Sequence, residues 1–336
     1  MNVWWLYKLR AALKSSATIL MYHRVATPIT DPWQLAVSPE NFEQQLQLLT
    51  KSKSVVSVPQ LVEALKSHKL NKKYIALTFD DGYIDNFHVV KPLLEKYEIP
   101  ATFFITTGYV GQKKEFWWDE LEKILIHTNR LPPSLKLDVE GKLYFFSLGT
   151  DTLLTKDLNI RHQNWIHYES PTARCRIYLE LWRLISPLKH EEQQQILASL
   201  REWAQIETKP RPEYCCMNSK QVKELASNPL FSIGAHTAFH PALACHPASV
   251  QRREIVESRL FLEKIVSKDI NILAYPSGSF NEESIAILKK EQYKAALSTI
   301  PKTVTNQEDP YKLGRFQVNN WGRNKFERNL LHWSCL

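Results

Sequence analysis

Short apolar runs alternate with helix-forming stretches along the first hundred residues of this chain and again after residue 219. The runs at 18–22, 55–58, 74–77 and 101–106 have the length and composition of buried strands, and helical patterns follow the first three. Parallel strands need a long crossover between them, and a helix supplies it. The alternation therefore predicts an α/β fold in which a parallel sheet closes into a barrel.

The alternation is interrupted after Gly111. The next hundred residues contain a hairpin pattern at 135–148 and a long helical stretch at 172–206. A segment of this length is large enough to fold as a mainly helical subdomain. We therefore expect three parts: the first part of the barrel at 1–111, an inserted subdomain at 112–217 and the second part of the barrel at 218–336.

Two adjacent carboxylates, Asp80 and Asp81, follow the apolar run 74–77 and precede Gly82. The carboxyl ends of the strands are where α/β barrels keep their chemistry. Neighbouring carboxylates repel each other, so a fold that places them together supplies a cation or divides their roles. We therefore expect both acids at the catalytic rim of the barrel, with a cation nearby.

Two histidines supply a candidate site for that cation. His236 and His240 follow the apolar run 231–235, and their imidazoles converge if the segment makes one helical turn. One aspartate and two histidines leave positions open for water and substrate, which is typical of a catalytic metal. The residues therefore predict a divalent metal ion. Zinc is the first candidate, although other divalent ions suit the same ligands.

Three motifs in this order resemble those of the polysaccharide deacetylases, the family that shares the NodB homology domain and is classed as carbohydrate esterase family 4. They are Thr78–Tyr83 (TFDDGY), His236–His240 (HTAFH) and Ala274–Gly278 (AYPSG). The resemblance runs from about Ile19 to Val318 with one large insertion. It implies a distorted barrel of about seven strands, with Asp81, His236 and His240 as metal ligands and Asp80 as the general base.

The resemblance offers two segments that could supply the general acid. A late Leu-x-x-His segment, which supplies the acid in many members, has no clean match here. Tyr22-His23 matches an early Tyr-His segment of the branch that resembles the poly-N-acetylglucosamine deacetylases. His23 is therefore our candidate general acid, and a buried core histidine is the alternative.

Six further residues are candidates for substrate binding. The backbone amide of Tyr83 would stabilise the oxyanion in the family. Tyr275 and Pro276 would line the groove or simply end a core strand. Arg315 would orient Asp80 through a charge-assisted hydrogen bond or lie on the surface. Trp117 and Trp118 would stack on a sugar or anchor the insertion to the barrel.

Composition indicates a globular protein and gives no sign of a nucleic-acid partner. The chain has 336 residues, of which 44% are hydrophobic and 23% are charged, as in a soluble globular protein. The net charge of +8 comes without a long basic run or a recognised motif, so we expect no nucleic-acid partner. The five cysteines show no zinc spacing, and they include the neighbours Cys215 and Cys216. We therefore expect free thiols in a reducing compartment.

The N-terminal apolar run is only five residues long before Lys8. A signal peptide or a membrane-spanning helix needs a longer run, so we expect a cytoplasmic protein. Two alternatives remain open for residues 2–10. They would lie peripherally at the inner face of a membrane, or they would form a first helix that packs on the barrel.

The expected function is a metal-dependent carbohydrate deacetylase that removes N-acetyl groups from an acetamido sugar during biosynthesis of a surface polysaccharide. A lipid-linked or nucleotide-linked sugar is the preferred partner. Two alternatives stay open. One is a glycan-binding pseudoenzyme without turnover. The complete set of two acids and two histidines argues against it. The other is hydrolysis of an O-acetyl ester or another amide on the same fold, since the same metal and base serve both reactions.

Overall fold

The computed structural model describes residues 16–51, 54–70, 74–207 and 209–334. The chain divides into two compact units. The first comprises 1–27, 35–112 and 216–336, and the second comprises 28–34 and 113–215. The predictions for residues 2–10 and for Cys335 lie outside the described residues. No helix in the described ranges is long and apolar enough to cross a membrane.

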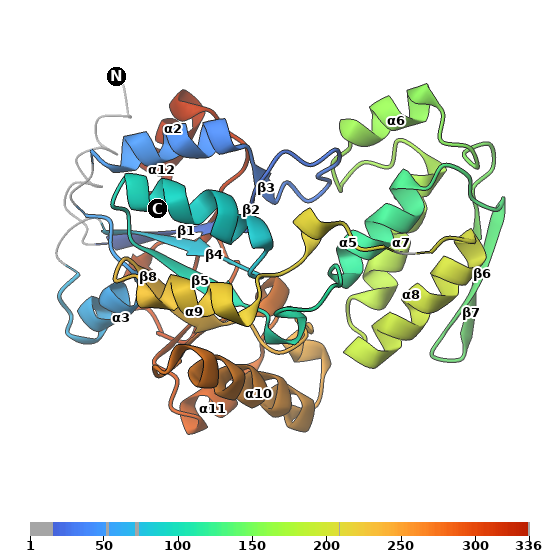
Figure 1. The fold of residues 1–336 in the computed structure, drawn as a ribbon. Coiled ribbons are helices and arrows are strands. Elements are labelled where there is room, and N and C mark those ends of the chain that lie inside the picture. The colour runs from blue at the N-terminus through green and yellow to red at the C-terminus, as the bar shows by residue number, and fades with distance from the viewer. Residues whose placement is uncertain (1–15, 52–53, 71–73, 208, 335–336) are drawn as a thin grey trace, which may run out of the picture. The chain divides into compact units, whose positions relative to one another are not determined.

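The first unit is built on a sheet of eight strands (Figure 1). Seven of them run parallel to their neighbours in the order β10-β9-β8-β5-β4-β1-β12, and β11 pairs antiparallel with β1. In chain order the strands are β1 (Ser16–Tyr22), β4 (Tyr74–Phe79), β5 (Ala101–Ile105), β8 (Phe231–Ala235), β9 (Ile272–Ala274), β10 (Ala295–Leu297), β11 (Val304–Thr305) and β12 (Phe316–Gln317). A separate parallel pair consists of β2 (Arg24–Val25) and β3 (Ala36–Val37).

One late segment, 313–317, connects the two ends of this sheet. Leu313 forms a parallel bridge with Leu297 of β10, and Phe316 of β12 pairs with Leu20 of β1. The sheet therefore curls into a barrel of mostly parallel strands. The prediction of an α/β fold with a distorted barrel and an inserted helical subdomain is confirmed.

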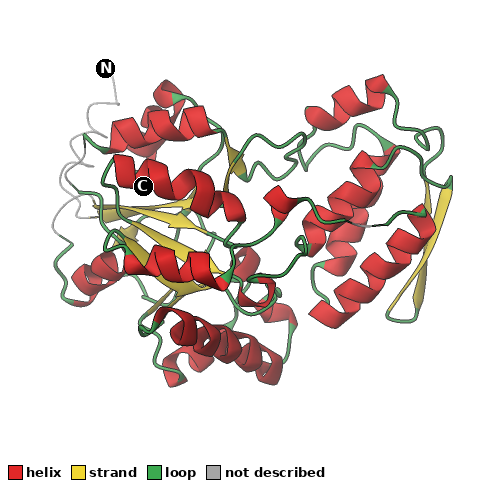
Figure 2. Ribbon diagram, in the orientation of Figure 1, coloured by secondary structure: helices red, strands yellow, loops and turns green. Residues whose placement is uncertain are grey.

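Helices surround this sheet (Figures 1 and 2). The longer ones are α2 (Pro39–Leu49), α3 (Val58–Lys66), α4 (Lys91–Lys96), α9 (Ser219–Ser227), α10 (Ala248–Val266), α11 (Glu282–Lys290) and α12 (Arg323–Trp333). The short ones are η1 (Asn86–Val90), η2 (Thr107–Tyr109), η5 (Leu243–Cys245) and η6 (Pro276–Gly278).

Alternate side chains along the central strands enter two separate apolar clusters, as the period of a strand requires. Leu20 of β1 and Leu77 of β4 belong to a cluster that also contains Phe42 of α2. Their chain neighbours Ile19 and Ala76 belong to the other cluster. Both faces of these strands are thus buried, which explains why their sequences are continuously apolar.

One predicted strand, 55–58, is wrong. Val55 forms only an isolated bridge with Ile75, and Val58 already begins α3. The cause is a capping box, in which the Ser57 side chain accepts from the Gln60 amide and the Gln60 side chain accepts from the Ser57 amide. This local pairing outweighs the β-preference of the two neighbouring valines.

Asn218 caps α9, the helix that leads to β8. Asn218 Oδ1 accepts from the Gln221 amide at 3.0 Å, and the Gln221 side chain accepts from the Asn218 amide at 2.8 Å. We expect Asn218→Ala to lower the free energy of unfolding by about 1 kcal/mol, because the helix loses this acceptor. Urea denaturation measures the change. Ser219→Ala is the control, and an equal loss in both variants would contradict the assignment.

The second unit consists of helices and a hairpin. Its elements are α5 (Trp117–Glu122), η3 (Lys123–His127), β6 (Ser134–Val139), β7 (Lys142–Ser147), α6 (Lys156–Gln163), α7 (Ala173–Ile185), α8 (His190–Ala204) and η4 (Pro212–Tyr214). The predicted hairpin is confirmed, and its turn residues Glu140 and Gly141 both have positive φ, as a two-residue hairpin turn requires. The predicted helical stretch 172–206 divides into α7 and α8 at Ser186–Lys189.

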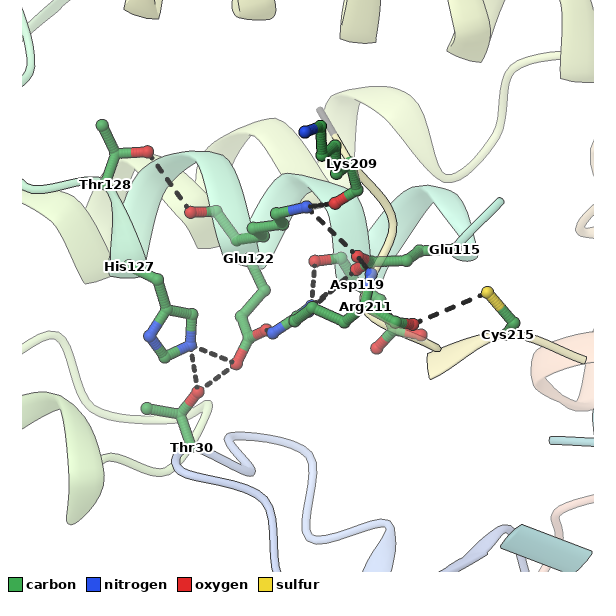
Figure 3. Close-up of polar contacts among 10 residues, drawn as sticks. Thr30, Glu115, Asp119, Glu122, His127, Thr128, Lys209, Arg211 and Cys215 are labelled. Atoms are coloured by element: carbon green, nitrogen blue, oxygen red, sulfur yellow. Dashed lines mark hydrogen bonds and ion pairs between the residues drawn. The ribbon is translucent and has the colours of Figure 1, made fainter. Parts of the chain in front are cut away.

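A network of charged side chains joins the start and the end of the 113–215 segment (Figure 3). The Arg211 guanidinium binds the carboxylate of Glu115 at 2.7 Å and that of Glu122 at 3.0 Å. Glu122 also accepts a hydrogen bond from Thr30, which belongs to the 28–34 segment. Burial lowers the pKa of Arg211, but the charge of Glu122 and the bond to Glu115 outweigh this effect and raise it. The network therefore links both ends of the 113–215 segment to the 28–34 segment.

Candidate active site

The candidate site lies in the first unit, at the carboxyl ends of β1, β4 and β8. Asp80 and Asp81 follow β4, and His236 follows β8. The amide of Asp80 donates to the carbonyl of Tyr22 at 2.9 Å, and the amide of His236 donates to that of Ile105 at 3.1 Å. Parallel strands end at the same edge of the sheet, so these bonds place the polar residues together.

Asp81, His236 and His240 form a cluster that is suited to a metal ion. The Oδ1 atom of Asp81 lies 3.4 Å from Nε2 of His236 and 3.5 Å from Nε2 of His240. One ligand atom from each residue lies within 4.8 Å of the other two. The described chain supplies no hydrogen-bond partner for the buried Oδ1 of Asp81. Such an orphaned carboxylate oxygen facing two imidazoles fits a divalent cation.

The orientation of His236 supports the same assignment. Its Nδ1 atom lies 2.8 Å from the carbonyl oxygen of Ala274, so Nδ1 carries the proton and donates it. In the neutral ring Nε2 is then the acceptor atom, and it faces Asp81. Metal-binding histidines are commonly fixed in this way, because the second ring nitrogen sets both the tautomer and the ring orientation.

The electrostatics of the cluster favour a bound cation. Burial raises the pKa of Asp81, but the contact with His236 and the charges of His240 and His23 outweigh it and lower the pKa to about 2. Burial lowers the pKa of His240 to about 3, although Asp81 opposes this shift. An ionised carboxylate and a neutral imidazole are the forms that bind metal. Burial lowers the pKa of His236, but the contact with Asp81 and the charge of Asp80 outweigh it and raise the pKa, so a metal ion would displace a proton there.

The segment 236–240 is a loop, so the predicted helical turn is wrong. Thr237 has a φ of 62° and His240 a φ of 60°, which is the left-handed region. The Thr237 hydroxyl accepts a hydrogen bond from the His240 amide at 3.0 Å. The two imidazole rings still converge, with centroids 4.8 Å apart. Asp81 also has a positive φ, of 70°. Left-handed non-glycine residues that gather at one place are typical of functional sites.

Asp80 has a different environment from its neighbour. The Arg315 guanidinium donates to both of its oxygens, from Nη1 to Oδ1 and from Nη2 to Oδ2, each at 2.7 Å. Arg315 also donates to the Thr78 hydroxyl and to the Ser298 carbonyl, and it is fully buried. The alternative of a surface arginine is therefore wrong, and the expected bond to Asp80 is present.

This pairing keeps Asp80 ionised. Burial raises the pKa of Asp80, but the charges of Arg315 and His236 outweigh it and lower the pKa. The two acids are thus held by different partners, Asp80 by an arginine and Asp81 by two histidines. Such a division allows one carboxylate to bind metal and the other to accept a proton.

His23 follows β1 and is half-buried. Its Nδ1 atom is buried and has no hydrogen-bond partner in the described part of the chain. The charge of His23 acts on the pKa of Asp80, Asp81 and His240, so its ring lies near all three. Its role as general acid stays a prediction.

Three other candidates are buried and engaged elsewhere. The ring of Tyr83 is fully buried, with the Arg24 guanidinium 4.7 Å from its centre. Tyr275 is also fully buried, and its hydroxyl donates to the carbonyl of Tyr311 at 3.0 Å. Pro276 is buried in the turn that follows β9. These contacts favour the alternative of a core strand end for Tyr275 and Pro276, and the role of the Tyr83 amide stays a prediction.

Trp117 and Trp118 pack inside the second unit. Their exposed fractions are 3% and 8%. Trp118 stacks on Phe116 at 4.5 Å between ring centroids, and Trp117 lies 5.9 Å from Trp182. This packing gives no support to sugar stacking, because a stacked sugar needs an exposed ring face. Substrate binding by these two residues stays a prediction.

Sequence reasoning missed a buried ion pair beside His23. Arg24 Nε donates to Oδ2 of Asp85 at 3.0 Å, and Oδ1 of Asp85 accepts from the Val25 amide. The side chain of Asn86 donates to the His23 carbonyl at 2.9 Å. These bonds tie the segment after β1 to the start of η1. The only sequence signal was the proximity of Asp85 and Asn86 to Asp81.

The sequence and the fold of this chain are similar to those of known proteins. A family model described as polysaccharide deacetylase matches residues 67–130 and 189–296. A relative from Staphylococcus epidermidis, named poly-beta-1,6-N-acetyl-D-glucosamine N-deacetylase, is 22% identical over 95% of this chain and 84% of its own length. A relative of the same name from Staphylococcus aureus is 28% identical over 44% of this chain and 58% of its own length.

Two solved structures share the fold. The Streptococcus pyogenes deacetylase PplD, in complex with acetate, has a TM-score of 0.55 and 20% identity and covers 94% of this chain and 98% of its own. IcaB from Ammonifex degensii has a TM-score of 0.57 and 17% identity and covers 96% of this chain and 97% of its own. At these identities the similarity establishes the fold alone.

Proposed function

Because this chain belongs to the polysaccharide deacetylase family, we propose that it is a metal-dependent hydrolase that removes N-acetyl groups from an acetamido sugar of a surface polysaccharide. One observation carries this proposal. Two adjacent carboxylates have separate partners, since Asp81 faces two histidines and Asp80 is held by Arg315. Amide hydrolysis needs both an electrophilic centre and a base, and this arrangement supplies a place for each.

Asp81, His236 and His240 would hold the ion, and zinc is the first candidate for these ligands. A bound divalent ion supplies polarisation of the acetamide carbonyl and a lowered pKa of water. Asp80 would accept the proton of the attacking water on its carboxylate. Arg315 keeps that carboxylate ionised and fixes its orientation. His23 would donate a proton to the departing sugar nitrogen, which is a poor leaving group until it is protonated.

The preferred substrate follows from the relatives. Both staphylococcal relatives are named for poly-β-1,6-N-acetyl-D-glucosamine, so β-1,6-linked N-acetylglucosamine is the first glycan to test. A lipid-linked or nucleotide-linked acetamido sugar and a cytoplasmic location stay predictions. An O-acetyl ester stays an alternative, because the same carboxylate and metal ligands serve ester hydrolysis.

Acetate release tests the proposal. The zinc-loaded protein is incubated with β-1,6-linked N-acetylglucosamine oligomers, with nucleotide-linked and lipid-linked N-acetylglucosamine and with an O-acetylated sugar. We expect acetate from at least one N-acetyl substrate. A chelator should abolish this release, and added zinc should restore it, because the proposed reaction depends on the bound ion. Release only from the O-acetyl sugar would identify an esterase. No release by protein with bound zinc would favour a glycan-binding pseudoenzyme.

A further inference from the structure

The loop that carries His240 has an unfavourable backbone conformation. Thr237 and His240 both have left-handed φ values, and neither is a glycine. Such residues persist only where the surroundings determine their conformation. The loop also lacks helical hydrogen bonds of its own, since residues 236–240 lie outside any helix or strand. Its shape therefore depends on contacts with neighbouring elements.

Glu254 of α10 provides two of these contacts. Its Oε2 atom accepts hydrogen bonds from two consecutive amides, that of Ala238 at 2.9 Å and that of Phe239 at 2.8 Å. The residue is only 4% exposed. A buried carboxylate that accepts from backbone amides makes stronger bonds than a neutral acceptor. α10 thus fixes the two residues between Thr237 and His240.

The opposite side of the loop is held by the segment after β5. The Thr107 amide donates to the Thr237 carbonyl at 3.2 Å, and the Gly108 amide donates to the Ala238 carbonyl at 2.7 Å. A side chain at residue 108 does not fit, because a Cβ atom there would lie 2.3 Å from the ring of Phe239. The loop is therefore held between α10 and this segment.

We propose that Glu254 is a positioning residue for the metal centre. Glu254 holds the 237–240 loop in the conformation that turns His240 Nε2 toward Asp81. The inference rests on the proposed function, because it takes His240 as a metal ligand. Glu254 does not act on the substrate or on the metal directly. Its Oε2 atom is bonded to the two loop amides, so it fixes the backbone from which His240 projects.

Zinc affinity tests this inference without any measurement of activity. We expect Glu254→Leu to raise the dissociation constant for zinc about 10- to 100-fold, as is usual when a residue that supports a metal ligand is lost. Glu254→Gln should recover most of the affinity, because its amide oxygen can accept from the same two amides. Competition with a chromophoric chelator measures each affinity. Wild-type affinity in Glu254→Leu would overturn the inference.

Gln251→Met is the matched control. Gln251 lies one turn earlier on α10 and is fully buried, and its side chain bonds to the carbonyl of His246 and to the hydroxyl of Ser284. Its loss should destabilise the protein in chemical denaturation but leave zinc affinity unchanged. Equal losses of affinity in Gln251→Met and Glu254→Leu would overturn the inference in favour of a general effect of α10. Failure of the wild-type protein to bind zinc or any other divalent ion would instead overturn the proposed function.

Hydrogen exchange of the wild-type protein covers the case in which Glu254→Leu does not fold. If Glu254 holds the loop before zinc binds, the amides of Ala238 and Phe239 should exchange slowly in the zinc-free protein. Fast exchange of both amides that slows only when zinc is added would overturn the inference, because zinc would then be ordering the loop.

Discussion

Replacing Asp80 by asparagine is expected to lower kcat for acetate release by about 10²- to 10⁴-fold while leaving zinc affinity nearly unchanged. Asparagine has the shape of aspartate, and its oxygen can still accept one bond from Arg315. Its amide cannot take the proton of the attacking water. Asp80 makes its contacts with Arg315, whereas Asp81 faces the histidines, so the change should not disturb the metal ligands.

Asp81→Asn is the comparison for this variant. The carboxylate of Asp81 faces His236 and His240, so its loss should weaken zinc binding as well as turnover. Chelator competition gives the affinity of each variant, and acetate release at saturating zinc gives kcat. A kcat of Asp80→Asn equal to that of the wild type would show that Asp80 is not the base. A loss of zinc in both variants would show that the two acids do not divide their roles.

Replacing Arg315 by leucine is expected to lower the free energy of unfolding by about 3–5 kcal/mol, because the change leaves a buried carboxylate without its partner. Arg315 is fully buried, and the Asp80 side chain is only 2% exposed. Two more acceptors lose a donor, namely the Thr78 hydroxyl and the Ser298 carbonyl. Chemical denaturation of the zinc-free protein measures the loss.

Arg252→Leu is the matched control for Arg315→Leu. Arg252 pairs with Glu291 at 2.8 Å, but its side chain is 54% exposed. An exposed ion pair of this kind contributes about 0–1 kcal/mol, so the control should change stability little. The double variant Asp80→Asn with Arg315→Leu should lose less stability than the sum of the single variants, because no buried charge is then left unpaired. Equal losses for Arg315→Leu and Arg252→Leu would disprove the role of the buried pair.

Much of the candidate site was predictable because its residues directly follow apolar strands. Asp81 and His236 come at the ends of β4 and β8, which lie two strands apart in the same parallel sheet. Parallel strands bring their carboxyl ends to one edge whatever the details of packing. The grouping of the metal ligands could therefore be inferred from local patterns and from the resemblance to known motifs.

The conformation of the His240 loop was not predictable. The spacing of four residues suggested a helical turn, but Thr237 and His240 adopt left-handed conformations. Intrinsic preference disfavours this conformation, and contacts with Glu254 and Gly108 stabilise it. Glu254 lies 14 residues beyond His240 in the sequence, within an ordinary amphipathic helix. No periodicity distinguishes it from the other charged residues of that helix.

Tertiary contacts in the second unit were also not predictable from the sequence. The composition of the insertion indicated helices and a hairpin, but not that residues 28–34 belong to the same compact unit. Thr30 reaches Glu122 there, and Trp33 stacks on His167 and packs at a tilt against Trp182. The aromatic residues near the start of α5 suggested sugar contact, yet the structure buries them. An aromatic ring serves a core and a sugar site equally well, so sequence alone does not distinguish the two.

The sequence by itself determined the α/β class of the barrel, the two acids at the end of β4 and the two histidines after β8, because these features depend on short apolar runs and on the residues that directly follow them. Only the tertiary structure decided that Arg315 holds Asp80, that Glu254 holds the His240 loop and that Trp117 and Trp118 are buried. The first two contacts join residues that are far apart in the sequence, and the third is the burial of aromatic rings. Burial and hydrogen-bond pairing depend on the packing of the whole unit, so the periodicity of the sequence does not reveal them.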